Sequence, residues 1–231
     1  LSLGKKENLA EVRGKITFHK ESINSEIKEI LKGTDIVFHV AALPRVQFSI
    51  HNPIESHETN INGSLNLLKL CSDAGIKRFI FSSSSSVYGD QEMLPLKETM
   101  KPNPMSPYAL HKLVIEHYCK LFYELYGLKT VSLRYFNVYG PKQDPAGAYA
   151  ILIPKFINLI QENQQPKIHG DGNQTRDFTY VDDVVSANLA SVSSNNKKIF
   201  RLVFNIGTGS NTSFNKITEK IIALLNSKIK P

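Results

Sequence analysis

The chain has 231 residues, of which 41% are hydrophobic and 21% charged, so it can bury one sizeable core and is not intrinsically disordered. Its net charge of +7 comes from Lys and Arg residues dispersed along the sequence, which argues against a nucleic-acid-binding protein. No apolar stretch reaches about 18 residues and no secretory leader opens the sequence, so we expect a cytoplasmic protein without membrane spans. The two cysteines, Cys71 and Cys119, lie far apart in the sequence, so we expect neither a disulfide nor a metal site.

Three short apolar runs, at 35–40, 78–81 and 130–135, predict buried parallel strands. Between the first two, apolar residues recur every three or four positions and stop at Gly75, which predicts a helix over 53–75. The same spacing predicts a second helix over 108–126. This alternation is typical of an α/β fold with a doubly wound parallel sheet, in which ligands bind at the carboxyl ends of the strands.

After Gly140 the pattern changes to a Pro- and Gly-containing loop, helical spacing near 150–162 and 181–192, and a strand-like segment at 202–206. We therefore divide the chain into a dinucleotide-binding part over 1–140 and a smaller α/β substrate-binding lobe over 141–231.

Serines occupy positions 82 to 86, directly after the second predicted strand, where a parallel sheet opens to ligands. About two dozen residues later, Pro107 suits the start of a helix and places Tyr108 and Lys112 on one helical face.

This arrangement resembles the extended short-chain dehydrogenase/reductases, in their NAD-dependent epimerase/dehydratase branch. The resemblance rests on a strand-end serine with Tyr-x-x-x-Lys and on these segments in the family's order: FSSSSSVYGD at 81–90, SPYALHK at 106–112, RYFNVYG at 134–140, GDG at 170–172 and RDFTYVDD at 176–183. It implies a Rossmann-like fold, bound NAD and a nucleotide-sugar substrate.

The resemblance implies a catalytic set of Ser84, Tyr108 and Lys112. In the family's scheme, Tyr108 would take the proton from the sugar O4 while hydride leaves C4 for NAD, Ser84 would hydrogen-bond the same oxygen, and Lys112 would hold the cofactor ribose and bias the tyrosine. Hydride then returns to the opposite face of the turned keto-sugar. A phenol with an ordinary pKa near 10 needs a shift of about 3 units to serve near neutral pH, which Lys112 and the nicotinamide charge could supply.

Further roles carry over position by position. The cofactor-binding set is Val40, Ala41, Ala42, Asn60, Ser82, Tyr108, Lys112 and Tyr135. The substrate-binding set is Ser84, Ser85, Ser86, Tyr108, Asn137, Gln143 and Arg176. Structural roles remain as alternatives: strand-end packing for the alanines, a polar helix-packing contact for Asn60, buried aromatic packing for Tyr135, a strand-end cap for Asn137 and an ion pair with Asp177 for Arg176.

The printed sequence departs from the family in lacking its opening strand, its G-x-x-G-x-x-G turn and its second strand, and Ser22 stands where an aspartate usually contacts adenine. A gene fragment, a sequence with missing ends, or a natural protein without its cofactor half would each explain this. For the 231-residue chain by itself we expect weak NAD binding at best.

The leading hypothesis is a UDP-hexose 4-epimerase. UDP-N-acetylglucosamine is favoured over UDP-glucose because RYFNVYGPKQDPAGAYA, with Gln143 and the pair Ala148 and Tyr149, resembles the N-acetyl-specific group. The alternatives are a 4,6-dehydratase, a UDP-glucuronate decarboxylase, or a non-catalytic binding protein built on this fold. The family also implies a homodimer through the helices at 53–75 and 108–126, and no nucleic-acid or membrane partner.

Overall fold

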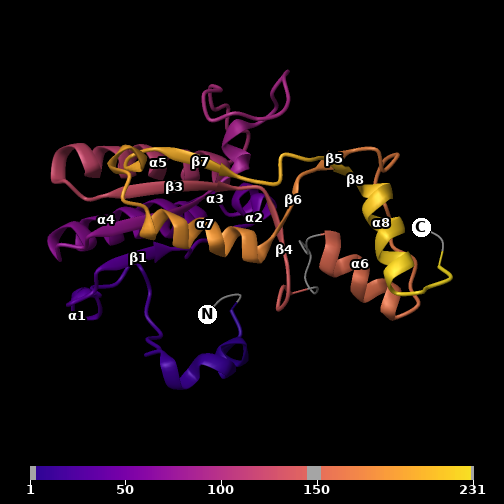
Figure 1. The fold of residues 1–231 in the computed structure, drawn as a ribbon, viewed down its shortest axis with the longest axis horizontal. Helices are drawn as coiled ribbons and strands as arrows, with labels where there is room; N and C mark the ends of the chain where they lie inside the picture. The colour runs from indigo at the N-terminus through magenta and orange to yellow at the C-terminus, as the bar shows by residue number, and fades with distance from the viewer. Residues whose placement is uncertain (1–3, 145–151, 230–231) are drawn as a thin grey trace.

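The computed structural model describes residues 4–144 and 152–229. Its centre is a four-stranded sheet in the order β1-β2-β3-β7, and all three neighbouring pairs are parallel (Figure 1). The strands are β1 (Ile36–His39), β2 (Arg78–Ser84), β3 (Thr130–Tyr135) and β7 (Val203–Ile206). The predicted parallel α/β sheet is therefore confirmed.

Helices cover both faces of this sheet, because side chains alternate along each strand. Phe79 and Phe81 of β2 point into a core that they share with α4 and α5, whereas Ile80 packs on the opposite face with Val131 and Leu133. The helices of the first face are α2 (Val46–His51), α3 (Pro53–His57), α4 (Ser64–Asp73) and α5 (Pro107–Tyr126). The opposite face is covered by α7 (Val181–Ser193).

The predicted helix over 53–75 differs from the observed one in its middle. A π-helical segment, η2 (Glu58–Gly63), joins α3 to α4, and it carries the buried Asn60. The Asn60 amide accepts a hydrogen bond from the Leu43 backbone nitrogen at 2.8 Å and donates to the Leu43 carbonyl at 3.1 Å. The wider turn thus coincides with a side chain that fastens the loop after β1.

A smaller group of elements lies at one end of the main sheet (Figure 1). It contains β4 (Asn137–Tyr139) paired with β6 (Phe178–Tyr180), β5 (Thr175–Arg176) paired with β8 (Thr212–Ser213), and the helices α6 (Leu152–Gln161) and α8 (Phe214–Leu224). Phe156, Ile160 and Ile221 form its apolar core. The division of the chain at residue 140 stays a prediction, but the chain does return to the main sheet afterwards, where β7 pairs with β3 and α7 packs.

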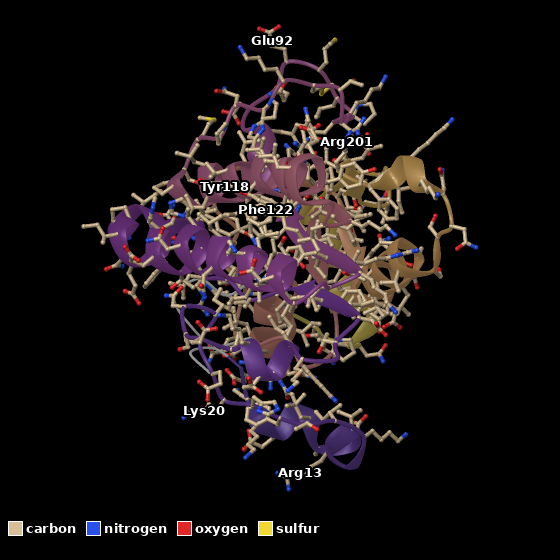
Figure 2. The ribbon with its side chains drawn as sticks, turned by 90° about the vertical axis from the view of Figure 1, so that its left-hand side faces the viewer. Arg13, Lys20, Glu92, Tyr118, Phe122 and Arg201 are labelled. Atoms are coloured by element: carbon tan, nitrogen blue, oxygen red, sulfur yellow. The ribbon has the colours of Figure 1, made fainter. Side chains whose placement is uncertain are left out.

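The remaining elements are short: η1 (Lys6–Lys15), α1 (Lys28–Leu31), η3 (Ser85–Tyr88) and η4 (Lys197–Ile199). Figure 2 shows Arg13 and Lys20 in the N-terminal segment and Glu92 at the tip of the loop after η3, at opposite outer ends of the molecule. Among the described residues, no helix is both long and apolar enough to cross a membrane.

Candidate active site

The serine run divides into two parts at the carboxyl end of β2. Ser82 and Ser83 are buried, whereas Ser84, Ser85 and Ser86 are partly exposed. Ser84 ends the strand and caps η3, since its Oγ accepts hydrogen bonds from the Ser86 backbone nitrogen at 3.2 Å and from the Ser86 Oγ at 2.9 Å. The third serine of the run is therefore held in a fixed position at the ligand-facing edge of the sheet.

Helix α5 brings the predicted tyrosine and lysine to the same place. Pro107 occupies its first turn and the Ser106 Oγ accepts a hydrogen bond from the Ala109 backbone nitrogen at 3.2 Å, so the helix begins next to Tyr108. The Tyr108 hydroxyl shares a hydrogen bond with Ser84. The Lys112 ammonium donates to the Ser82 carbonyl at 2.6 Å and lies 5.8 Å from the centre of the Tyr108 ring.

Burial dominates the electrostatics of this cluster. It raises the pKa of Tyr108, and the hydrogen bond with Ser84 acts in the opposite direction. Burial also lowers the pKa of Lys112 to about 8, against the attraction of the Glu116 carboxylate. The lowered tyrosine pKa expected from the sequence is therefore not produced by Ser84 and Lys112 alone.

Ser82 links the two faces of the sheet. Its carbonyl accepts the Lys112 hydrogen bond, and its Oγ lies 3.1 Å from the Tyr135 hydroxyl. Asn188 of α7 donates to the same hydroxyl at 2.8 Å. Tyr135 is therefore held by its hydroxyl against α7 as well as by packing of its ring.

The residues expected near NAD fit its nicotinamide and ribose half. Val40 is 64% exposed, Ala41 is exposed and Ala42 half-buried, so an apolar surface stands open where β1 ends. This does not match the strand-end packing considered as the alternative. The Lys112 ammonium has three donors and makes one hydrogen bond to the described residues, which leaves donors for ribose hydroxyls. The Asn60 side-chain amide, in contrast, forms hydrogen bonds with Leu43 and Ser56, as the helix-packing alternative expects.

Apart from the serines and Tyr108, the expected substrate contacts lie on β4, β5 and the loop after β4. Asn137 donates its side-chain amide to the Asp177 carbonyl at 3.3 Å. Gln143 donates to the Val138 carbonyl at 3.2 Å, and its buried Oε1 has no partner among the described residues. Within those residues, no hydrogen bond joins Asn137, Gln143 or Arg176 to the Ser84 cluster. Ala148 and Tyr149 lie outside the described residues.

Arg176 does not form the ion pair with Asp177 that was considered as an alternative. The Asp177 carboxylate accepts hydrogen bonds from Thr208, Gly209 and Thr179. The Arg176 guanidinium is exposed, 5.7 Å from the centre of the Phe214 ring, and so is free of a carboxylate partner in the described part of the chain.

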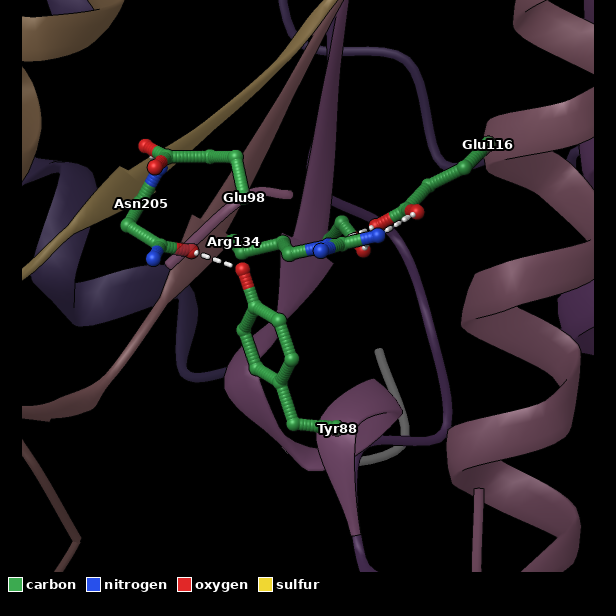
Figure 3. Close-up of polar contacts among 6 residues, drawn as sticks. Tyr88, Glu98, Glu116, Arg134 and Asn205 are labelled. Carbon is green, nitrogen blue, oxygen red and sulfur yellow. Dashed lines mark hydrogen bonds and ion pairs between the residues drawn. The ribbon is translucent and has the colours of Figure 1, made fainter. Parts of the chain in front are cut away.

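Sequence reasoning missed a buried polar network beneath the site (Figure 3). We call it the Glu116 network, and its members are Ser83, Tyr88, Glu116, Arg134 and Asn205. Ser83, Arg134 and Asn205 stand side by side on β2, β3 and β7. Glu116 of α5 accepts hydrogen bonds from Ser83 and Arg134, and Asn205 accepts one from Tyr88. The available signal was an acidic residue beside Ile115 and Cys119 on the apolar face of a helix, four positions after Lys112. No cluster of three potential metal ligands from His, Cys, Asp and Glu occurs in the described ranges.

Comparisons with known proteins identify the family of the chain. A family model described as the NAD dependent epimerase/dehydratase family matches residues 3–207. The "Putative UDP-glucose 4-epimerase" of Methanocaldococcus jannaschii is 41% identical over 87% of this chain and 67% of its own length.

Solved structures superpose closely. The UDP-N-acetylglucosamine 4-epimerase from Methanobrevibacter ruminantium M1, in complex with UDP-N-acetylmuramic acid, is 44% identical, with a TM-score of 0.95 over 99% of this chain and 73% of that one. The UDP-glucuronic acid 4-epimerase from Bacillus cereus, in complex with UDP-glucuronic acid and NAD, is 32% identical, with a TM-score of 0.89 over 97% and 71%. The chain spans 67%, 58% and 53% of the length of three curated relatives.

Proposed function

The chain belongs to the NAD dependent epimerase/dehydratase family, and from this membership we propose that it forms the catalytic part of a UDP-hexose 4-epimerase. The observation that carries the proposal is the meeting of Ser84, Tyr108 and Lys112 at the carboxyl end of β2. A partly exposed hydroxyl, a buried phenol and a buried ammonium are the groups required to move one proton at a sugar oxygen.

NAD would be held at the carboxyl edge of β1 and β2. Lys112 would bind its ribose hydroxyls, Val40, Ala41 and Ala42 would pack against it, and Tyr135 and Ser82 would border the site. Asn60 would act indirectly by fixing the loop after β1. When bound, NAD supplies a hydride acceptor and donor for the sugar carbon and a positive ring beside Tyr108.

Residues of this chain would carry out the proton transfer at the sugar hydroxyl. Tyr108 takes it from the sugar hydroxyl as that carbon is oxidised and returns it when the carbon is reduced. Ser84 donates a hydrogen bond to the same sugar oxygen and Lys112 stabilises the phenolate. The burial of Tyr108 and Lys112 excludes water, so the charge of Lys112 acts more strongly than it would at the surface.

The serine loop favours epimerisation over elimination or decarboxylation. In the related 4,6-dehydratases an Asp-Glu pair follows the hydroxyl residue, and the decarboxylases usually carry a glutamate before the Val-Tyr-Gly turn. Ser85 and Ser86 stand at these positions in this chain. A serine hydroxyl titrates too high to act unaided as a general acid or base, whereas a carboxyl can be tuned by burial.

Product analysis tests the reaction class. The protein, expressed over its whole reading frame, would be incubated with UDP-N-acetylglucosamine, UDP-glucose, UDP-glucuronate and dTDP-glucose, and the products separated by chromatography and weighed. We expect isomers of unchanged mass. A product lighter by water or carbon dioxide would overturn the proposal.

For the sugar, we propose UDP-N-acetylglucosamine as the preferred substrate, with support from the segment around Gln143. The buried Gln143 Oε1, which has no partner within residues 4–144 and 152–229, is an acceptor, and an acetamido N–H is a matching donor. Gln143→Leu should lower kcat/KM for UDP-N-acetylglucosamine by roughly tenfold, the effect of one lost hydrogen bond, and leave UDP-glucose nearly unaffected. An equal loss for both sugars would contradict this preference.

For the nucleotide, we propose that Asn137 and the exposed Arg176 contact the diphosphate, because a planar guanidinium and an amide suit that group. Arg176→Lys should raise KM more than it lowers kcat. A change confined to kcat would contradict this role.

For assembly, we propose a homodimer through α3–η2–α4 and α5. Ile54 is 78% exposed on α3. Leu110, Leu121 and Leu125 form an exposed apolar stripe along α5, with the last two about three and four turns from the first. Leu121→Glu should shift the protein from dimer to monomer in analytical ultracentrifugation, and a monomeric wild-type protein would exclude the proposal.

A further inference from the structure

Glu116 lies one helical turn after Lys112 on α5, and its side chain is buried. Its carboxylate accepts hydrogen bonds from the Arg134 Nε at 2.9 Å, the Arg134 Nη2 at 2.6 Å and the Ser83 Oγ at 2.5 Å. Figure 3 shows the Arg134 side chain extended along the sheet towards Glu116. The carboxylate is thus fixed from two strands at once.

Other groups face Lys112 as well. His39 of β1 is neutral, because burial lowers its pKa to about 3. Cys119 of α5 is a neutral thiol, because burial raises its pKa to about 12. Burial also raises the pKa of Tyr108, so the phenol keeps its proton. Among these groups, Glu116 supplies the negative charge that stabilises the buried ammonium.

We propose that Glu116 is a positioning residue for Lys112: its carboxylate keeps the Lys112 ammonium charged and directed at the Ser82 carbonyl, while Arg134 limits that attraction. The consequence for catalysis rests on the proposed epimerase function, in which Lys112 must carry its charge to stabilise the Tyr108 phenolate.

Two buried cations lie close to the Glu116 carboxylate: Arg134 binds it directly, and Lys112 lies one helical turn away on α5. Arg134 cannot release its proton under ordinary conditions, so Lys112 is the cation that responds when the balance changes. Without the Glu116 charge, Lys112 would face Arg134 with no compensation and would deprotonate more readily. Without the Arg134 charge, the whole carboxylate would act on Lys112, which would then hold its proton more tightly. A purely structural role predicts no such opposition, since loosening the packing would move Lys112 in the same direction in both cases.

Side-chain NMR of the chain labelled with ¹³C and ¹⁵N on its lysines tests this without NAD or substrate. The Lys112 signal would be assigned from its loss in Lys112→Met. In the wild type we expect its pKa near the value of about 8 that burial produces. Glu116→Gln should lower it by about one unit or more, and Arg134→Met should raise it. Glu124→Gln, the same change at an exposed position of α5, is the matched control and should leave the pKa of Lys112 unchanged.

Shifts in the same direction for the two variants, or no shift in either, would overturn the proposal. Should Glu116→Gln fail to fold, as judged by circular dichroism, Glu116→Asp keeps the charge but withdraws it by one methylene, and it should lower the pKa by less. No shift in that variant would also overturn the proposal. Failure of the epimerase assay leaves these titrations readable, so the two proposals fail separately.

Discussion

Helix α5 carries two polar clusters one turn apart that differ in how their hydrogen bonds are used. In the Glu116 network, most donors and acceptors meet one another: Arg134 binds Glu116 through two nitrogens, and the Tyr88 hydroxyl donates to Asn205 at 2.7 Å. The Arg134 Nη1 has no hydrogen-bond partner among the described residues, and the guanidinium lies 4.6 Å from the centre of the Tyr88 ring. At the Ser84, Tyr108 and Lys112 cluster, the groups have few partners and open towards solvent at the serines. The same sheet therefore supports both, the first as a brace and the second as a site whose polar groups remain available to a ligand.

The largest effect should come from the open cluster and concern activity alone. Tyr108→Phe removes the hydroxyl that moves the proton, so we expect kcat of the protein from its whole reading frame to fall by about 10²–10⁴. The free energy of unfolding should change by less than about 1 kcal/mol, because the ring stays in place. Turnover within tenfold of the wild type would refute the assignment.

The braced cluster should show the converse, a loss of stability. Glu116→Ala leaves the buried Arg134 charge without a partner, which we expect to cost about 3–5 kcal/mol of unfolding free energy in urea denaturation. Glu124→Ala, on the exposed face of the same helix, should stay within about 0.5 kcal/mol. Equal losses of unfolding free energy in the two variants would show that the buried Glu116 stabilises the fold no more than the exposed Glu124 does.

A pH titration of stability should reveal the buried ammonium of the open cluster. The pKa of Lys112 is about 8 in the folded chain, below its ordinary value of 10.5. Between these values the unfolded chain binds more protons, so the unfolding free energy should rise with pH, by on the order of 2 kcal/mol from this group. Denaturation at several pH values between about 7.5 and 10 would measure the slope of the unfolding free energy against pH. Subtracting the slope measured for Lys112→Met gives the contribution of Lys112. Identical slopes would contradict the prediction.

The smallest effect should come from Ser86. Its hydroxyl donates to the Ser84 Oγ, but its backbone nitrogen donates to the same atom and survives substitution. Ser86→Ala should therefore lower kcat by less than about tenfold, whereas Ser84→Ala, which removes the oxygen itself, should cost more. Steady-state assays of the two variants would decide, and a larger loss for Ser86→Ala would show that its hydroxyl has a role of its own.

Local pattern accounts for what the sequence predicted. The strands at 36–39 and 130–135 and the first part of the strand at 78–84 are marked by apolar runs, and Pro107 marks the helix that places Tyr108 beside Lys112. The apolar run predicts that the second strand ends at residue 81, but the strand continues through Ser84 because Ser82, Ser83 and Ser84 pair with β3. Long-range pairing accounts for what it missed. The location of β7 beside β3, and hence the row of Ser83, Arg134 and Asn205, depends on strand register that a single sequence does not reveal.

The π-helical turn at 58–63 was missed for a related reason. Asn60 contacts Leu43, seventeen positions away, and the spacing of residues within the helix does not predict this contact. Asn137 and Arg176 matched a family motif, yet their partners in the structure, Asp177 and Phe214, come from tertiary packing.

The hydrogen bond that fixes Lys112 ends on the main-chain carbonyl of Ser82, a group that all twenty amino acids carry. Ser82→Ala would therefore remove the hydroxyl contact with Tyr135 and leave the carbonyl that binds Lys112 in place. Replacing the amide that follows residue 82 with an ester, which weakens the carbonyl as an acceptor, would instead expose the dependence. The position of the Lys112 ammonium thus depends on the path of the main chain at residue 82, whereas the Ser82 side chain serves a separate contact.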